Sequence, residues 1–122
     1  MLAEALSGPL ETQAERLTRG YLTLWEDPAT SARMQALARS ALSNEAASER
    51  TQALLTGAIA GPGVAPLLAG RRTGFTLAMA QLLGVAITRY LTHVPQLVEL
   101  DFENLVARTT PVVQLHLNAA DD

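Results

Sequence analysis

Apolar residues recur every three to four positions through most of the 122-residue chain, and the pattern breaks at proline, glycine and short polar runs. This period predicts amphipathic helices, and no segment shows the sustained β-branched alternation that predicts a strand. We therefore expect an all-α fold with about five helices, over residues 11–25, 28–42, 45–59, 71–94 and 101–117. The last two are the long helices of the set.

Capping residues and prolines mark the expected helix boundaries. Thr12-Gln13-Ala14-Glu15 has the capping-box pattern, and Asp27-Pro28 suits the end of one helix and the first turn of the next. Gly61-Pro62-Gly63 ends the third helix and opens a connection to residue 70, which is either an ordinary surface loop or a flexible lid. Pro111 is expected to bend or divide the fifth helix, because proline removes one backbone hydrogen bond.

The fourth helix is apolar on two opposite sides. At 100° per residue, one arc is wide enough to face the helix's own chain, and it contains Phe75, Met79, Leu82, Leu83, Ala86 and Tyr90. The opposite arc is also apolar and contains Leu77, Ala80, Gly84, Ile87 and Leu91. A glycine in mid-helix is unfavourable, so Gly84 suggests the close approach of another helix.

A second copy of the chain is the simplest cover for the second arc, since a large exposed apolar patch usually marks an interaction site. Pairing of the fourth and fifth helices with their counterparts would give a four-helix dimer interface around a twofold axis. From the fifth helix we assign Leu105, Thr109, Val112 and His116 to this interface. The alternative is burial of both arcs inside a monomer.

Charge and composition argue against nucleic acid and membrane as direct partners. The formal net charge is −3, and the nine arginines are scattered without the cluster that a phosphate-binding surface needs. Residues 51–70 are interrupted by glycine and proline, and the uncharged run from Thr73 to Thr88 is short for a membrane span. The first residues lack the basic and apolar regions of a signal peptide.

The residues offer little for catalysis or metal binding. The chain has no cysteine and two histidines, and no phosphate-binding loop or nucleophile elbow is present. His93 and His116 lack neighbouring metal ligands and are interpreted as structural. We therefore expect no enzyme activity, no metal and no cofactor.

Three stretches resemble the C-terminal domain of the tetracycline-repressor (TetR) family of transcription regulators, especially the actinobacterial type. They are ERLTRGYLTLWEDPATSARMQALARSALSNE (Glu15–Glu45), AQLLGVAITRYL (Ala80–Leu91) and LVARTTPVVQLHL (Leu105–Leu117), the last with a mid-helix proline typical of that group. The resemblance covers nearly the whole chain. It implies a cytoplasmic regulator whose single C-terminal domain, residues 1–122, dimerises through the last two long helices and binds a small molecule among the earlier ones.

In that family a helix-turn-helix domain precedes this part, and these residues do not supply one. DNA binding is therefore expected only through an N-terminal domain absent from this chain. Large aromatic and adaptable methionine side chains suit an apolar effector, and on that ground the expected ligand-binding residues are Tyr21, Trp25, Met34, Leu37, Phe75, Met79 and Leu83. The alternative function is a freestanding helical dimeric interaction module or small-molecule carrier.

Overall fold

The computed structural model describes residues 2–61 and 63–121, and over these ranges the chain forms helices and turns with no strand. The all-α prediction is confirmed. The elements in chain order are α1 (Leu2–Ser7), α2 (Leu10–Glu26), α3 (Pro28–Ser43), α4 (Glu45–Ala60), the 3₁₀ turn η1 (Ala65–Leu68), α5 (Arg72–Ala86), the π-helical turn η2 (Ile87–Leu91), α6 (Pro95–Val98) and α7 (Phe102–Asn118).

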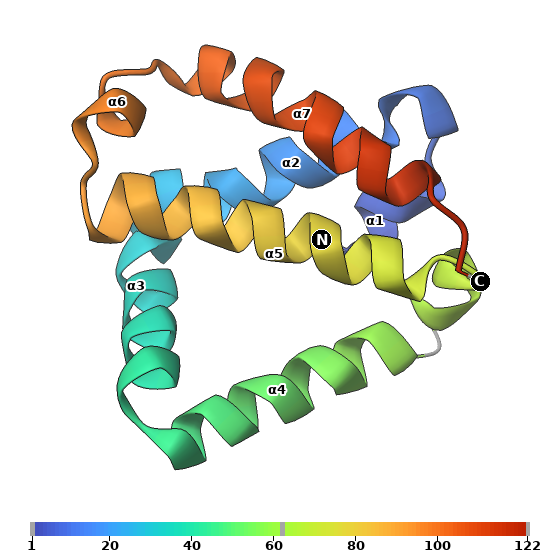
Figure 1. The fold of residues 1–122 in the computed structure, drawn as a ribbon, viewed down its shortest axis with the longest axis horizontal. Coiled ribbons are helices and arrows are strands. Elements are labelled where there is room, and N and C mark those ends of the chain that lie inside the picture. Colours follow the sequence, from blue (N-terminus) through green and yellow to red (C-terminus); the bar gives the residue numbers. More distant parts are fainter. Residues whose placement is uncertain (1, 62, 122) are drawn as a thin grey trace.

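Helices α2, α5 and α7 form the core, and each packs against the other two (Figure 1). Each helix contributes one apolar stripe to the core, and this stripe produces the helical period of apolar residues in the sequence. The largest fully buried side chains come from all three helices and from η1, and they include Trp25, Leu17, Leu22, Phe75, Leu82, Leu105, Val113, Leu117 and Leu68.

Helices α3 and α4 form an arm beside this core. Helix α3 packs against α2, while α4 makes its main contacts with α3 and η1 (Figure 1). Among the side chains that the structure describes in this arm, Ala38 and Ala47 are buried, whereas Leu37, Leu42 and Leu54 are half or more exposed. The arm therefore contributes much less to the core than its length suggests.

Two helix starts, those of α3 and α7, follow the predicted capping chemistry. The Asp27 carboxylate accepts a hydrogen bond from the Ala29 amide at 2.9 Å, and the Asp101 carboxylate accepts one from the Asn104 amide at 2.8 Å. The capping box at residues 12–15 is a wrong prediction, since α2 already begins at Leu10. Pro9 starts that helix instead, because its fixed φ suits the entry to a first turn.

The connection between α4 and α5 has more structure than the sequence suggested. Residues 65–68 form η1, and Leu68 is fully buried, so this connection is packed onto the core. Arg71 fastens it: the guanidinium donates to the Leu67 carbonyl at 2.9 Å and to the Leu117 carbonyl at 3.4 Å. Pro62, part of the predicted helix stop, lies outside the described residues. Helices α1 and α6 were not predicted at all.

The two long helices end in different ways. Helix α5 continues through the π-turn η2, and His93 then adopts a left-handed conformation with φ of 55°. Helix α7 runs unbroken through Pro111, which does not divide it. Pro111 and Ala107, the residue whose carbonyl loses its partner, are both exposed, so water can solvate that carbonyl.

Close approach between α5 and α7 depends on Gly74. A Cβ atom at this position would lie 2.1 Å from the His116 carbonyl oxygen, a distance that no side chain can tolerate. The chain's C-terminal segment reinforces this contact, because the Asp121 carboxylate accepts hydrogen bonds from the Arg72 and Thr73 amides, both at 3.0 Å. Asp121 thus caps α5 from the far end of the sequence, and these backbone bonds lower its pKa.

Candidate ligand and dimerisation sites

The seven residues predicted to bind a ligand divide into three groups by burial. Tyr21, Trp25 and Phe75 are buried in the core, and Met34 and Met79 are partly buried against the same core. Leu37 and Leu83 are 51 % and 39 % exposed. Five of the seven therefore meet in or beside one apolar cluster, while Leu83 does not lie on the buried arc of α5 to which the sequence assigned it.

An aromatic and charged cluster joins the C-terminal ends of α2 and α5. The rings of Trp25 and Tyr90 are stacked, with centroids 6.0 Å apart and planes 22° apart. The Tyr90 hydroxyl donates to the Glu26 carboxylate, and the Arg89 guanidinium lies 5.3 Å from the Tyr90 ring centroid. Burial and the Glu26 carboxylate together raise the pKa of Tyr90, so its hydroxyl remains protonated.

Arg89 is buried, and its partners fix the segment between α5 and α7. Its guanidinium donates to the Leu97 and Leu100 carbonyls, each at 2.6 Å, and lies 3.7 Å from the Glu26 carboxylate. Arg89 was not singled out from the sequence, because a lone arginine near a helix end is usually solvated. Position 89 nevertheless continues the buried stripe of Phe75, Ala78, Leu82 and Ala86 at helical spacing, so the side chain lies on the buried side.

Two buried polar atoms on α2, the Thr18 hydroxyl and the Trp25 indole N–H, make no hydrogen bond of good geometry among the described residues. Thr18, Tyr21 and Trp25 are spaced so that they share one face of the helix. Burial raises the pKa of Tyr21, and the Trp25 side chain, which lies within hydrogen-bonding reach of the Tyr21 hydroxyl, opposes this effect. Thr18 was not among the predicted ligand residues, although its spacing of three and seven from Tyr21 and Trp25 could have pointed to it.

The expected interface residues on α5 are at least partly exposed. Leu77 is 49 % exposed, Ala80 and Gly84 are exposed, and Ile87 and Leu91 are partly buried. A Cβ added at Gly84 would meet nothing within 4 Å in this chain. The arc from residue 73 to residue 88 that faces away from the core carries no charged side chain.

On α7 the assignment needs correction. Leu105 and Thr109 are 2 % and 6 % exposed, so they belong to the chain's own core and cannot contribute much contact area to a partner. Val112 is 37 % exposed and His116 is partly buried. The error arose because a helix with a wide apolar stripe does not show from sequence alone where the core-facing part ends.

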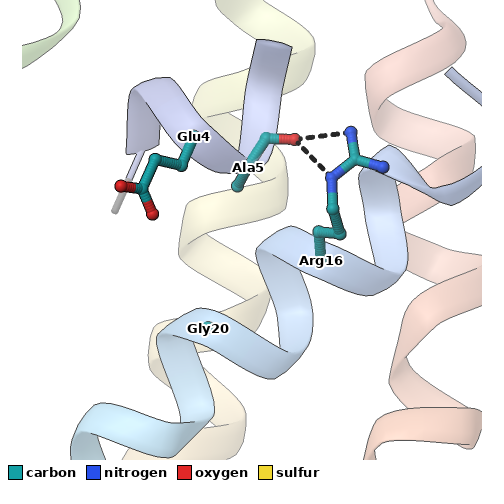
Figure 2. A pocket seen from close by; sticks show the side chains of 4 residues that line it. All are labelled: Glu4, Ala5, Arg16 and Gly20. Atoms are coloured by element: carbon teal, nitrogen blue, oxygen red, sulfur yellow. Dashed lines mark hydrogen bonds between the residues drawn. The ribbon is translucent and has the colours of Figure 1, made fainter. Parts of the chain in front are cut away.

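Two shallow hollows lie near the ends of the molecule. A hollow of about 370 Å³ lies between α5, α7 and the C-terminal segment and is lined by Thr73, Gly74, Leu77, His116, Ala119, Ala120 and Asp121. It places Leu77 and His116 together, as the predicted interface requires. The other, of about 190 Å³, lies between α1 and α2, where the Arg16 guanidinium donates two hydrogen bonds to the Ala5 carbonyl (Figure 2).

Neither hollow is lined by a cluster of potential metal ligands: His116 and Asp121 line one, and Glu4 lines the other. Across residues 2–61 and 63–121 there is no cluster of three histidine, cysteine or carboxylate side chains that could hold a metal ion.

The Tetracyclin repressor-like, C-terminal domain family model matches residues 11–117, which is most of the chain. The chain belongs to this family. Domains of the family are parts of non-enzymatic transcription regulators, in which they bind ligands and dimerise. No curated protein and no solved structure shows a significant match to the chain.

In this TetR-like domain, the segment Arg72–Leu91 is long and apolar enough to cross a membrane by length and composition, with a mean hydropathy of 1.2. By sequence, the uncharged run from Thr73 to Thr88 is short for a membrane span, but the continuous helix is longer. Its length is therefore a weaker argument against a span. Core helices pass the same test, and one side of this helix is packed into the core through Phe75, Ala78 and Leu82.

Proposed function

We propose that this chain is the effector-sensing and dimerisation domain of a cytoplasmic TetR-family repressor. In this proposal it forms a homodimer, binds a small apolar effector, and acts on DNA through a helix-turn-helix domain that these residues do not include. The observation that carries the proposal is the two-sided apolar character of α5. Its inner side is buried against α2 and α7, and its outer side is uncharged and open.

The outer side of α5 supports dimerisation because it combines exposed apolar side chains with small residues. Leu77 provides apolar area, while Ala80 and Gly84 allow a second helix to approach closely. His116 on α7 lines the same hollow as Leu77, and the exposed Val112 lies one turn before it on α7. An interface of the size that stable dimers need, about 1,200–2,000 Å² in total, would require both helices.

Sedimentation of the 122-residue chain over a dilution series tests the dimer. We expect a dimer in the parent chain and a monomer after Leu77→Asp, because an unpaired charge in an interface is strongly unfavourable. Leu54→Asp is the matched control: Leu54 is 70 % exposed on α4, away from α5 and α7, so this variant should remain dimeric. A parent chain that stays monomeric at high micromolar concentration would contradict the proposed dimer.

The effector is proposed to be apolar because the predicted ligand residues are aromatic and methionine side chains around the core. Thermal-shift screening of neutral apolar compounds tests this. Compounds that raise the unfolding temperature of the parent should lose affinity after Met79→Ala, whereas the exposed-site control Leu42→Ala should bind them as the parent does.

The regulatory part of the proposal requires a DNA-binding domain in the same polypeptide. A helix-turn-helix encoded in frame upstream of Met1 would support it. The longer protein should then bind operator DNA, and an effector from the thermal-shift screen should release it. By contrast, the 122-residue chain should not retain duplex DNA at physiological salt, because its arginines are scattered.

A further inference from the structure

Helix α1 is held against α2 at its last turn. The buried Gln13 side chain of α2 donates from Nε2 to the Leu6 carbonyl at 2.9 Å. The Arg16 guanidinium donates to the Ala5 carbonyl at 2.9 and 3.2 Å (Figure 2). Carbonyls in the last turn of a helix have no partner within that helix. These two side chains of α2 therefore supply the partners that the end of α1 needs.

Gln13 also reaches the connection η1, through Arg71. The Gln13 Oε1 accepts a hydrogen bond from the Arg71 guanidinium at 3.4 Å, and the same guanidinium donates to the Leu67 carbonyl of η1 at 2.9 Å. One end of the Gln13 amide thus holds α1, and the other end contacts the residue that fastens η1. Arg16 differs, because its hydrogen bonds among the described residues all lie within residues 5–12.

The connection η1 is the place where the arm and α1 meet. It packs against α4 on the arm and against α1. Its Leu68 side chain is fully buried and fixes η1 on the core. The arm itself contributes few buried side chains, so its position depends on contacts with α2 and η1 more than on the core. A displacement of α4 therefore acts on η1 directly.

We propose that Gln13 and Arg71 couple α1 to η1, so that a displacement of η1 or of the arm changes how firmly α1 is attached. This inference rests on the proposed function, because the DNA-binding domain of that proposal would precede α1 in the chain. It adds a route by which the effector-binding part would control that domain. Gln13 is the positioning residue of this route, since one side chain holds both α1 and Arg71.

The lengths of the bonds make the coupling sensitive to small movements. The Arg71–Gln13 bond, at 3.4 Å, is longer than the 2.7–3.2 Å typical of N–H···O bonds, while the Arg71–Leu67 bond is of ordinary length. Arg71 therefore follows η1 closely and Gln13 loosely. Because the donor is charged, a shift of η1 toward Gln13 strengthens this bond considerably, and a shift away breaks it.

Pro66→Gly perturbs η1 without removing a buried side chain, because Pro66 is an exposed residue of η1 and glycine loosens the backbone. The measurement is hydrogen–deuterium exchange of the peptide that contains α1, in the 122-residue chain. A peptide from α7 is measured beside it, because that peptide reports opening of the whole core. We expect Pro66→Gly to raise exchange of the α1 peptide about three- to fivefold relative to the α7 peptide.

Two variants separate coupling from simple attachment of α1. Gln13→Met removes both hydrogen bonds of the side chain and keeps its approximate shape, and it should raise exchange of α1 about fivefold or more. Adding Pro66→Gly to it should then change that exchange by less than about 1.5-fold. Arg16→Met is the matched control, because Arg16 also holds α1 but is not linked to η1 by its hydrogen bonds among the described residues. In that background, Pro66→Gly should still raise exchange about three- to fivefold.

Gln13→Glu is the second variant, in case Gln13→Met does not fold. At pH 7 its carboxylate accepts from Arg71 but cannot donate to the Leu6 carbonyl, so it should also abolish the response of α1 to Pro66→Gly. The coupling is refuted if Pro66→Gly leaves exchange of α1 unchanged in the parent. It is also refuted if the response persists in a folded Gln13 variant, or if it is lost equally with Arg16→Met.

These outcomes are separate from the fate of the proposed function. A dimeric chain in which α1 does not respond to Pro66→Gly would refute the coupling, and the regulator proposal would stand with another route to α1. A response that depends on Gln13 in a chain that sediments as a monomer, or in a longer protein that no effector releases from DNA, would confirm the coupling and refute the regulator.

Discussion

The two glycines of α5, Gly74 and Gly84, lie near opposite ends of one helix and have opposite surroundings. A Cβ at Gly74 would lie 2.1 Å from the His116 carbonyl oxygen of α7, whereas a Cβ at Gly84 would meet nothing within 4 Å. The sequence drew attention to Gly84, yet within this chain the close helix approach occurs at Gly74. Helix α5 thus has an inner face that packs against its own chain and an outer face that the chain leaves uncovered.

Gly74→Leu should be the most damaging change to the inner face. The side chain would collide with the backbone of α7, which cannot move without disturbing the core, and we expect a loss of about 3 kcal/mol or more in the free energy of unfolding. Urea denaturation measures it. Gly57→Leu is the control, because Gly57 on α4 has open space around it and should lose little or nothing.

Arg89→Met should cost about 2–4 kcal/mol of unfolding free energy, since it leaves the Leu97 and Leu100 carbonyls without their charged donor. Thermal and urea unfolding test this expectation. Arg108→Met, at an exposed position of α7, should change stability by less than about 0.5 kcal/mol. Equal effects of the two variants would mean that the inner face does not depend on Arg89.

Gly84→Leu tests whether a second chain covers the outer face of α5. Within one chain it should be tolerated, because leucine favours helix and meets no neighbour. In the proposed dimer it would force the paired helices apart, and overpacking of about 1–3 kcal/mol corresponds to dissociation roughly five- to 150-fold easier. Sedimentation and circular dichroism should therefore show a helical monomer. A variant that stays as dimeric and stable as the parent would place Gly84 in solvent.

Asp121→Asn should have the smallest effect, and it should depend on pH. The pKa of Asp121 is held below its usual value of 3.8 by the Arg72 and Thr73 amides, so its carboxylate stabilises the fold above about pH 4. That stabilisation is lost as the pH falls through the lowered pKa. The asparagine variant should thus melt below the parent at pH 7, and the gap should close toward pH 2. The pKa of Glu103 is also lowered, by its hydrogen bond with Arg19. Because Glu103 titrates in both proteins, its contribution cancels in the difference between their melting temperatures.

Much of the fold could be predicted because it depends on short-range patterns. The five long helices, the caps at Asp27 and Asp101, and the core positions Phe75, Leu82 and Ala86 all follow from helical periodicity and local side-chain chemistry. The family was also recognisable, since the stretches that carry the resemblance lie within the matched residues 11–117.

The candidate site was predictable only in part. Residue type indicated Tyr21 and Trp25, because large aromatic side chains on a helix face are buried or bind ligands. Periodicity could not show that the Thr18 hydroxyl lacks a partner among the described residues, since that depends on what surrounds it in three dimensions.

The sequence by itself determined where the five long helices lie and that α5 is apolar on both sides, because these properties repeat within a few residues along the chain. Only the tertiary structure decided which glycine faces a neighbouring helix, that Asp121 caps α5 from 49 residues away, and that Leu105 and Thr109 belong to the core instead of the outer face. These features depend on contacts between segments distant in sequence. A helical period gives the angle of a side chain around its own axis, but it does not say which helix, if any, lies on that side.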